Sequence, residues 1–256
     1  MYHYTIWQWL LFFYIYSFIG WCWETAYTSI KKRHFENRGF LRGPFLPIYG
    51  SGAIMMLIVA SSFHNLIAIY FAGLVGATVL ELITGVVMEA MFKVRYWDYS
   101  TKFCNYKGYI CLGSSVAWGF FTIILIKYVH KPIADVVLGE PTKVINFVGI
   151  ALTFYIVIDF ILSVHGAFKW RAVLERAKEA VAGIGGLENR INAMIGFADG
   201  KWKKYTLRRQ LNRVRGNATM VSKHHKELLS EVKELLKNPK AFRKIKALSG
   251  REKNTK

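Results

Sequence analysis

The chain has 256 residues, of which 53% are hydrophobic and 16% aromatic, yet its formal net charge is +19. Residues 1–169 hold 13 Lys and Arg against 8 Asp and Glu, whereas residues 170–256 hold 22 against 8, so the two parts carry +5 and +14. This separation excludes an evenly charged soluble domain. It predicts an apolar, membrane-embedded body over 1–169 and a basic, soluble extension over 170–256.

Five windows of about 20 mostly apolar residues are each long enough to cross a hydrocarbon core of about 30 Å. They lie at 6–27, 44–64, 66–88, 109–129 and 144–167. The first window is rich in aromatic residues and no basic stretch precedes it, so we interpret it as a span and not as a cleaved signal peptide. The sequence therefore predicts an all-α, polytopic membrane helix bundle.

Basic residues in short loops mark the cytoplasmic side of a membrane protein. The loop after the second window carries no Lys or Arg, and in the loop after the fourth window two lysines are balanced by two acidic residues. The loops after the first and third windows are basic, with Lys31, Lys32, Arg33, Arg38 and Arg42 in one and Lys93, Arg95, Lys102 and Lys107 in the other. Five spans then place the N-terminus outside the cell and the basic C-terminal extension in the cytoplasm.

Four acidic residues lie in or at the ends of these windows: Glu24, Glu81, Glu89 and Asp159. A charge at the centre of a span costs about 2.5–3.5 kcal/mol on insertion scales, so such residues face a bundle interior or a water-filled cavity. Glu81 is the deepest of them and the first candidate for a functional site. The alternative for each is a structural ion pair, a protonated carboxyl group or a contact with headgroup water.

The loop "NRGFLRGPFLPIYG", residues 37–50, combines glycines, two prolines and two arginines at the entry to the second span. Pro44 and Pro47 suit a first helical turn, and the glycines before them allow close approach of the backbone. A loop followed by a helix start explains that part of the pattern. This interpretation does not explain the two arginines, Arg38 and Arg42. Arg42 is expected to pair with a carboxylate or to hold a phosphate-bearing headgroup or substrate, and Arg38 is the other candidate for holding a lipid phosphate.

The stretch "YWDYS", residues 96–100, has two interpretations. Trp97 and Tyr99 suit an aromatic belt at a membrane boundary, with Asp98 merely beginning a loop or capping a short helix. The expected topology, however, places Asp98 on the same side as the arginine-bearing loop and the carboxylates. We therefore predict that Asp98 belongs to a cytoplasm-facing polar site, with Asn105 as a further contributor.

The remaining polar and cysteine residues of the body have simpler interpretations. The segment "GYICLGSSVAWG" at the start of the fourth span is rich in Gly and Ser, which favours close helix packing. Cys22, Cys104 and Cys111 have no CxxC spacing, so they indicate neither a disulfide framework nor a zinc site, and we expect small buried side chains. His130 is expected on the outer side without a role.

The C-terminal extension carries apolar residues every three or four positions over 174–194 and again over 207–235, with a break at Gly200. This spacing predicts an amphipathic helical hairpin, with a short third helix near 241–248. The basic stretch after the break favours anionic lipid headgroups at the inner face; a solvated or oligomer-forming face is the alternative, and nucleic acid is the least favoured partner. The candidate lipid contacts are Lys201, Lys203, Lys204, Arg208 and Arg209.

Five segments together resemble one family. They are "YSFIGWCWE" ending at Glu24, "NRGFLRGPFLPIYG", "ELITGVVME" from Glu81 to Glu89, "WDYS" and "NYKGYICLGSSVAWG". Through them the body is similar to bacterial multi-pass proteins labelled "putative ABC-transporter type IV", or CmpB-like, and to transmembrane protein 229-type proteins. The resemblance implies transport across a bacterial inner membrane. The chain has no GxxxxGK[ST] loop, so the ATPase of such a transporter would be a separate subunit.

Three functions stay open at this point. A permease-like transport component would use the carboxylates as a polar pathway and Arg42 as a substrate contact. A membrane enzyme or binding protein would act on a phosphate-bearing lipid or small molecule, with carboxylates that suit a divalent cation; no other cofactor is indicated. A non-catalytic sensor or scaffold would depend on the basic extension. We favour transport, assign no catalytic residue, and regard a homo-oligomer as a further candidate arrangement.

Overall fold

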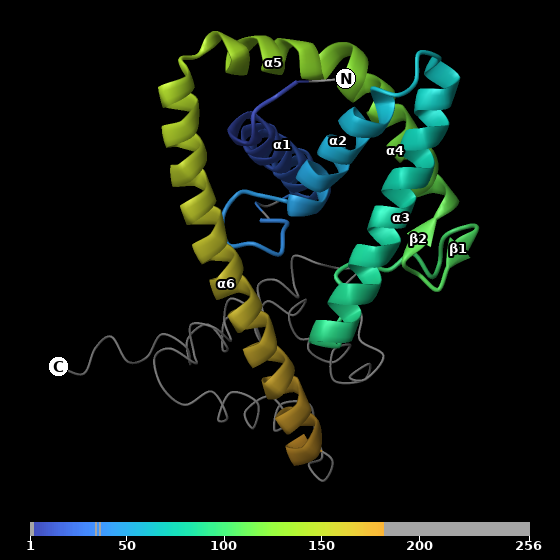
Figure 1. Ribbon diagram of the computed structural model, residues 1–256. Helices are drawn as coiled ribbons and strands as arrows, with labels where there is room; N and C mark the ends of the chain where they lie inside the picture. Colours follow the sequence, from blue (N-terminus) through green and yellow to red (C-terminus); the bar gives the residue numbers. More distant parts are fainter. Residues whose placement is uncertain (1–2, 34, 36, 182–256) are drawn as a thin grey trace, which may run out of the picture. The chain divides into compact units, whose positions relative to one another are not determined.

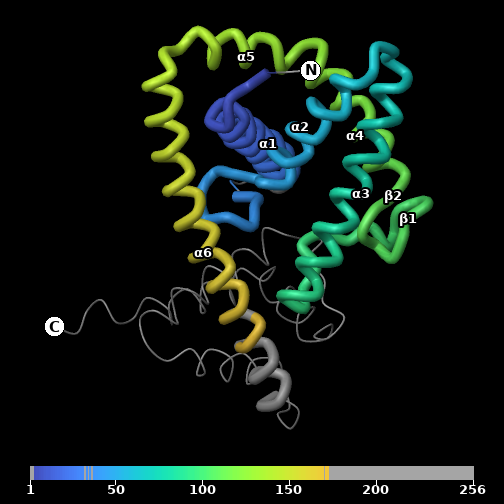
Figure 2. Tube along the Cα trace, in the orientation of Figure 1, coloured from blue at the N-terminus to red at the C-terminus, as the bar shows by residue number. Residues whose placement is uncertain are grey.

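The computed structural model describes residues 3–33, 35 and 37–181, and these are mostly helical. Figure 1 labels the elements, and Figure 2 traces the same path along the Cα atoms. In chain order they are α1 (Ile6–Lys32), α2 (Pro47–Ala60), α3 (Leu66–Phe92), β1 (Asn105–Tyr106), β2 (Ile110–Cys111), α4 (Leu112–Ile124), the π-helix η1 (Leu125–Val129), α5 (His130–Gly139) and α6 (Thr142–Val181). Residues 174–181 of the predicted tail hairpin are helical and form the end of α6. The rest of that hairpin, its third helix and its candidate lipid contacts lie outside the described residues.

Three of the described helical stretches are long and apolar enough to cross a membrane: Leu66–Phe92, Leu112–Gly139 and Thr142–Lys169. α2 is apolar but has 14 residues, and the Trp and Tyr residues of α1 lower its hydropathy. On α3 the exposed side chains of Ile67, Phe71 and Val75 follow one another at helical spacing, which suits contact with lipid. The helical, membrane-embedded character is thus supported, while the five-span count and the orientation stay predictions.

The chain divides into two compact units. The first comprises Met1–Val87 with Asp98–Ser163, and the second comprises Met88–Trp97 with Val164–Lys256. Within the second unit, the rings of Phe92 and Phe168 meet edge to face with centroids 5.2 Å apart, and Arg171 donates a hydrogen bond to the backbone oxygen of Met91. The predicted division at residue 169 into a membrane body and a soluble extension stays a prediction.

Small residues bring α1 and α2 into close contact. A Cβ atom at Gly20 would overlap the ring of Tyr49, and one at Gly50 would overlap the hydroxyl of Ser17. The backbone N–H of Leu46 also donates to the carbonyl of Ser17 at 2.9 Å, which fixes the chain at the entry to α2. Tyr49 is thereby held against α1, and its hydroxyl is carried toward the end of that helix.

Gly50→Ala is expected to lower the free energy of unfolding by about 1–3 kcal/mol, the usual effect of overpacking. The added methyl group would lie 2.5 Å from the backbone oxygen of Phe13, which cannot rotate away as a side chain would. The measurement is the apparent Tm of purified protein in detergent. Gly113→Ala is the matched control, because nothing lies within 4 Å of a Cβ atom there. Equal Tm values for the two variants would contradict this account of the α1–α2 contact.

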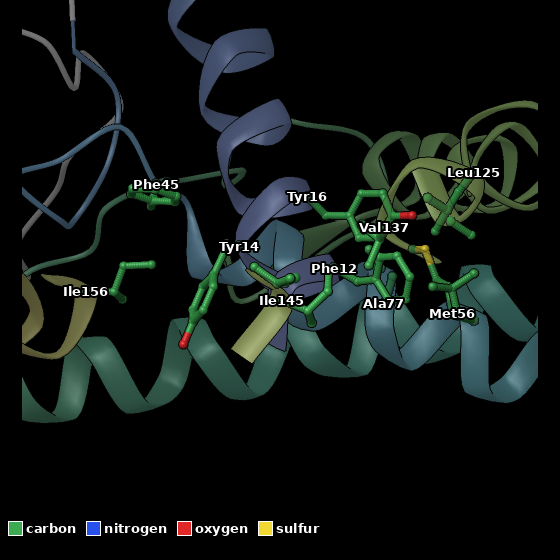
Figure 3. Close-up of a cluster of buried hydrophobic side chains, with 14 of the residues drawn as sticks. Phe12, Tyr14, Tyr16, Phe45, Met56, Ala77, Leu125, Val137, Ile145 and Ile156 are labelled. Carbon is green, nitrogen blue, oxygen red and sulfur yellow. The ribbon is translucent and has the colours of Figure 1, made fainter. Parts of the chain in front are cut away.

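The apolar core of the first unit draws side chains from α1, α2, α5 and α6 (Figure 3). Phe12 of α1 and Leu57 of α2 are fully buried, and Val137 of α5 and Ile145 of α6 pack in the same cluster. Aromatic rings dominate the α1 contribution. This core fixes the positions of α1 and α2, from which the polar side chains of the site extend.

His130 at the start of α5 is buried beside this core. Its Nδ1 lies 2.7 Å from the hydroxyl of Tyr16 and its Nε2 lies 3.1 Å from the hydroxyl of Tyr4. We expected no role for His130, whereas these contacts tie the N-terminal segment and α1 to α5. The π-helix η1 ends directly before His130. Short π-helical segments of this kind are frequent at functional sites.

The short hairpin of β1 and β2 precedes α4. Lys107 and Gly108 adopt positive φ values of 51° and 76°, and the N–H of Tyr109 closes the turn on the carbonyl of Tyr106 at 3.0 Å. Two successive residues at positive φ are typical of a tight hairpin turn, and Gly108 adopts this conformation without steric cost.

Two helices begin a few residues after the starts of the predicted apolar windows, for local reasons. α2 begins at Pro47, since the chain before it forms the loop that Leu46 fastens to α1. Residues 109–111 belong to the hairpin, and α4 begins only after Cys111, whose Sγ accepts from the N–H of Ser114 at 3.4 Å. Cys111 is buried as expected, but Cys22 and Cys104 are exposed.

Candidate functional site

Glu81 is a buried carboxylate of the first unit with hydrogen-bond partners on both oxygens. It lies on α3, its side chain is almost fully enclosed with 5% of the residue exposed, and both of its oxygens have partners. The hydroxyl of Tyr99 donates to Oε1 at 3.0 Å, and the indole N–H of Trp118 donates to Oε2 at 3.3 Å. The hydroxyl of Ser114 lies 3.2 Å from Oε2 and 2.9 Å from the carbonyl of Cys111, so its single hydrogen can serve either acceptor.

Glu24, near the end of α1, is partly exposed and has two partners. Its Oε1 accepts from the hydroxyl of Tyr49 at 2.8 Å, and its Oε2 lies 3.6 Å from Nε of Arg38. Arg38 itself is placed by its backbone N–H, which donates to the hydroxyl of Thr25 at 3.3 Å. Glu24 is therefore paired with Arg38, whereas we expected Arg42 to be the arginine that pairs with a carboxylate.

Tyr49 and Trp118 join these two carboxylates into one group. Their ring centroids are 5.4 Å apart, and each ring donates a hydrogen bond to a different carboxylate. Glu24 and Glu81 also interact electrostatically. We call Glu24, Tyr49, Glu81, Tyr99, Ser114 and Trp118 the carboxylate cluster. It leads from the partly exposed ion pair of Glu24 with Arg38 to the buried carboxylate of Glu81.

The loop before α4 positions Tyr99 for its contact with Glu81. The N–H of Tyr99 donates to the carbonyl of Gly108 at 2.9 Å, and the carbonyl of Tyr99 accepts from the N–H of Lys102 at 2.8 Å. Burial, and then the negative charge of Glu81, raise the pKa of the Tyr99 hydroxyl well above its usual range, because both disfavour the phenolate. Tyr99 therefore keeps its proton and acts as a donor at neutral pH.

Asp98 and Asn105 hold the same loop together. The carboxylate of Asp98 accepts from the N–H and from the hydroxyl of Ser100, both at 3.0 Å. The side-chain amide of Asn105 donates to the carbonyls of Ser100 and Lys102 and accepts from the N–H of Gly108. These contacts make the loop a rigid support for Tyr99. That Asp98 and Asn105 also contribute to the polar site stays a prediction.

Asp159 of α6 binds the backbone of the arginine-bearing loop. Its Oδ1 accepts from the N–H of Arg42 at 3.0 Å and its Oδ2 from the N–H of Gly43 at 2.6 Å, while Asp159 is 5% exposed. The guanidinium of Arg42 donates to the carbonyl of Leu162 at 3.3 Å. Asp159 thus fastens the loop to α6 through main-chain groups, and this contact accounts for a carboxylate within an apolar helix.

Glu89 belongs to the second unit, where it forms a buried ion pair with Nε of Arg95. The backbone N–H of Lys93, a residue with a left-handed φ of 58°, donates to the carbonyl of Glu89 at 2.8 Å. The turn after α3 therefore folds back on the helix end and brings Arg95 to Glu89. Glu89 thus takes part in a structural ion pair, and its membership of a polar site stays a prediction.

Sequence reasoning missed four members of the carboxylate cluster. The helix-packing interpretation of "GSSVAWG" concealed Ser114 and Trp118, and the interpretation of residues 37–50 as a loop and helix start concealed Tyr49. Tyr99 was assigned to an interfacial belt. One signal was available, since Ser114 and Trp118 are four residues apart and so share a helix face. Their common partner lies on another helix, which spacing within one segment does not reveal.

The described residues contain no group of three or more His, Cys, Asp or Glu side chains that could hold a metal ion. Glu24 and Glu81 are bound instead by tyrosine, tryptophan and arginine donors. A divalent cation at the carboxylates stays a prediction.

A family model described as "Putative ABC-transporter type IV" matches residues 11–164. This range contains the whole carboxylate cluster, the loop with Arg38 and Arg42, and Asp159. The expected resemblance is confirmed over this range. Comparison with curated proteins and with solved structures gives no match.

Proposed function

Because the chain belongs to the putative ABC-transporter type IV family, we propose that it is the membrane-spanning, permease-like component of a transporter. Three long apolar helices support a membrane location. The chain has no nucleotide-binding loop. Energy from nucleotide hydrolysis would then come from a separate ATPase subunit.

The proposed orientation places the N-terminus outside the cell, five spans in the plasma membrane and the C-terminus in the cytoplasm. Its support is the charge of the connecting segments. The segments around Arg38 and Lys102 are basic, whereas the one between Ala60 and Leu66 carries neither Lys nor Arg. In this orientation Glu24 and Arg38 face the cytoplasm.

The polar site is proposed to be the carboxylate cluster, and the observation that carries this proposal is the environment of Glu81. A buried acid within a mostly apolar helix is expensive in a membrane and marks a pathway for a polar solute or a proton. Glu81 has donors on both oxygens, and Glu24 lies at the partly exposed end of the same cluster. The cluster would bind a cation or proton entering from the cytoplasmic side.

Glu81→Gln is expected to reduce flux by about tenfold or more, since an interaction of about 1.4 kcal/mol already corresponds to a factor of ten. Gln keeps the shape and one acceptor, so the variant should still fold. Flux is measured in sealed membrane vesicles from cells expressing the chain, which retain partner subunits, with ATP added. The probes are Mn²⁺, which quenches entrapped calcein, and a fluorescent phospholipid.

Glu140→Gln is the matched control, because Glu140 is an exposed acid in the segment between α5 and α6. Chemical conversion of the phospholipid without movement would favour a membrane enzyme over a transporter. If Glu81→Gln leaves expression, Tm and flux at their wild-type values, the cluster is not the polar site.

A further inference from the structure

The β1–β2 hairpin and the loop residues just before β1 present an exposed surface, formed by Lys102, Phe103, Tyr106 and Lys107 and called the hairpin tip below. Phe103 is 80% exposed and Tyr106 is 53% exposed, and Lys102 and Lys107 are exposed beside them. The ammonium of Lys107 lies 5.4 Å from the centroid of the Tyr106 ring. The hairpin tip thus carries aromatic rings and lysine side chains, and residues 99–110 include no acidic side chain.

The hairpin lies beside a membrane-spanning part of the chain. Tyr99, at its base, contacts Glu81, which follows Leu66 at the start of α3 by fifteen residues. At a rise of 1.5 Å per residue this is about 22 Å along the helix, less than the hydrocarbon thickness of about 30 Å. The chain after α3 therefore returns along the helix toward the membrane, and Figure 1 shows the hairpin beside α3 and α4.

We infer that the hairpin tip, formed by Lys102, Phe103, Tyr106 and Lys107, binds the anionic headgroup layer of the membrane. Aromatic side chains are enriched at this depth, where their rings enter the interface. Lysine side chains near an anionic membrane surface are attracted by its negative surface potential. A soluble acidic protein would satisfy the lysines but would have to approach a tip that lies alongside the bilayer.

Hydrogen bonds connect the hairpin tip to the loop segment that carries Tyr99, a member of the carboxylate cluster. Asn105 bonds to both Ser100 and Lys102, and the N–H of Tyr99 is bound to Gly108 within the same loop. Headgroup charge therefore acts on the element that holds Tyr99 against Glu81. The lipid contact requires only the membrane location of α3 and α4, and it is independent of the solute that the chain carries.

The exposed Cys104 allows the contact to be measured directly. The full chain with Cys22→Ser is labelled at Cys104 with an environment-sensitive fluorophore and reconstituted into vesicles of phosphatidylcholine alone or with phosphatidylglycerol. With the anionic lipid, we expect emission at shorter wavelength, quenching by a headgroup-level nitroxide lipid and protection from aqueous iodide. Added salt should reverse the difference, because screening weakens headgroup attraction.

Lys102→Glu with Lys107→Glu should remove the dependence on phosphatidylglycerol, and Phe103→Ser should reduce nitroxide quenching. Lys127→Glu with Lys131→Glu is the control of equal charge change, at two exposed lysines of η1 and α5. It should retain the wild-type response. Emission that is independent of lipid composition, full exposure to iodide in both vesicles, or a wild-type response from the Lys102/Lys107 variant would each overturn the inference. None of these outcomes depends on flux.

Discussion

Asp159→Ala should be one of the most destabilising single substitutions in the first unit. It removes the acceptor of two backbone N–H groups, those of Arg42 and Gly43, at a buried position. Each buried donor left without an acceptor costs about 1–3 kcal/mol, so the expected loss in the free energy of unfolding is about 2–6 kcal/mol. The measurement is the apparent Tm of the purified chain in detergent.

A local measurement separates this mechanism from general destabilisation. If Asp159 fastens the loop, trypsin should cleave the Arg42–Gly43 bond faster in Asp159→Ala than in the wild type, well below the Tm. Asp159→Asn keeps one acceptor and should fall between the two. Ser163→Ala, which loses only a 3.4 Å contact with Oδ1 of Asp159, is the control. A wild-type Tm and unchanged cleavage in Asp159→Ala would show that the loop is held by other contacts.

Helix content and the locations of polar side chains could be predicted from the sequence, but their partners could not. Long apolar runs dictate helices, because only a helix satisfies its own backbone within a segment. Glu24 and Glu81 stood out since a charge in such a run is costly. Glu24 does pair with a loop arginine, but Arg38 and not Arg42 is the one in contact.

The sequence did not reveal which residues that are distant along the chain come into contact in the fold. Asp159 looked like a site residue, whereas its present partners are backbone N–H groups, which occur at every non-proline residue and leave no mark in the sequence. The start of the fourth span was misplaced because "GYIC" is apolar, yet Lys107 and Gly108 form a hairpin turn just before it. Because of this turn, Ile110 and Cys111 form strand β2 and are not the first residues of the helix.

Tyr99→Phe should lower the free energy of unfolding by about 1.5–3 kcal/mol, the usual contribution of a hydrogen bond to a charged group. Phe fills the same space but cannot donate to Glu81. In a Glu81→Gln background the same substitution should cost less, because the charged acceptor is already absent. Equal costs in both backgrounds would show that the two side chains do not act together. Tyr106→Phe, at an exposed tyrosine of the same hairpin, is the control.

The stability difference between the wild type and Tyr99→Phe should depend on pH in a direction that the pKa of Tyr99 sets. The pKa of Tyr99 is raised in the folded protein, so its stabilising effect is complete below the unfolded value of about 10 and declines as pH rises beyond it. The Tm of the wild type should therefore exceed that of Tyr99→Phe by a constant amount between neutral pH and about pH 10. Above that pH the difference between the two Tm values should become smaller. A difference that widens above that pH would contradict the raised pKa.

The contacts of His130 make its two tyrosines unequal. A neutral imidazole carries one N–H and one bare nitrogen, so when His130 is neutral either Tyr4 or Tyr16 must accept from the ring while the other donates to it. Moving the ring proton from one nitrogen to the other would reverse both hydroxyl groups together. The link between the start of the chain and the middle of α1 thus has a direction, and that direction can be inverted without moving any heavy atom.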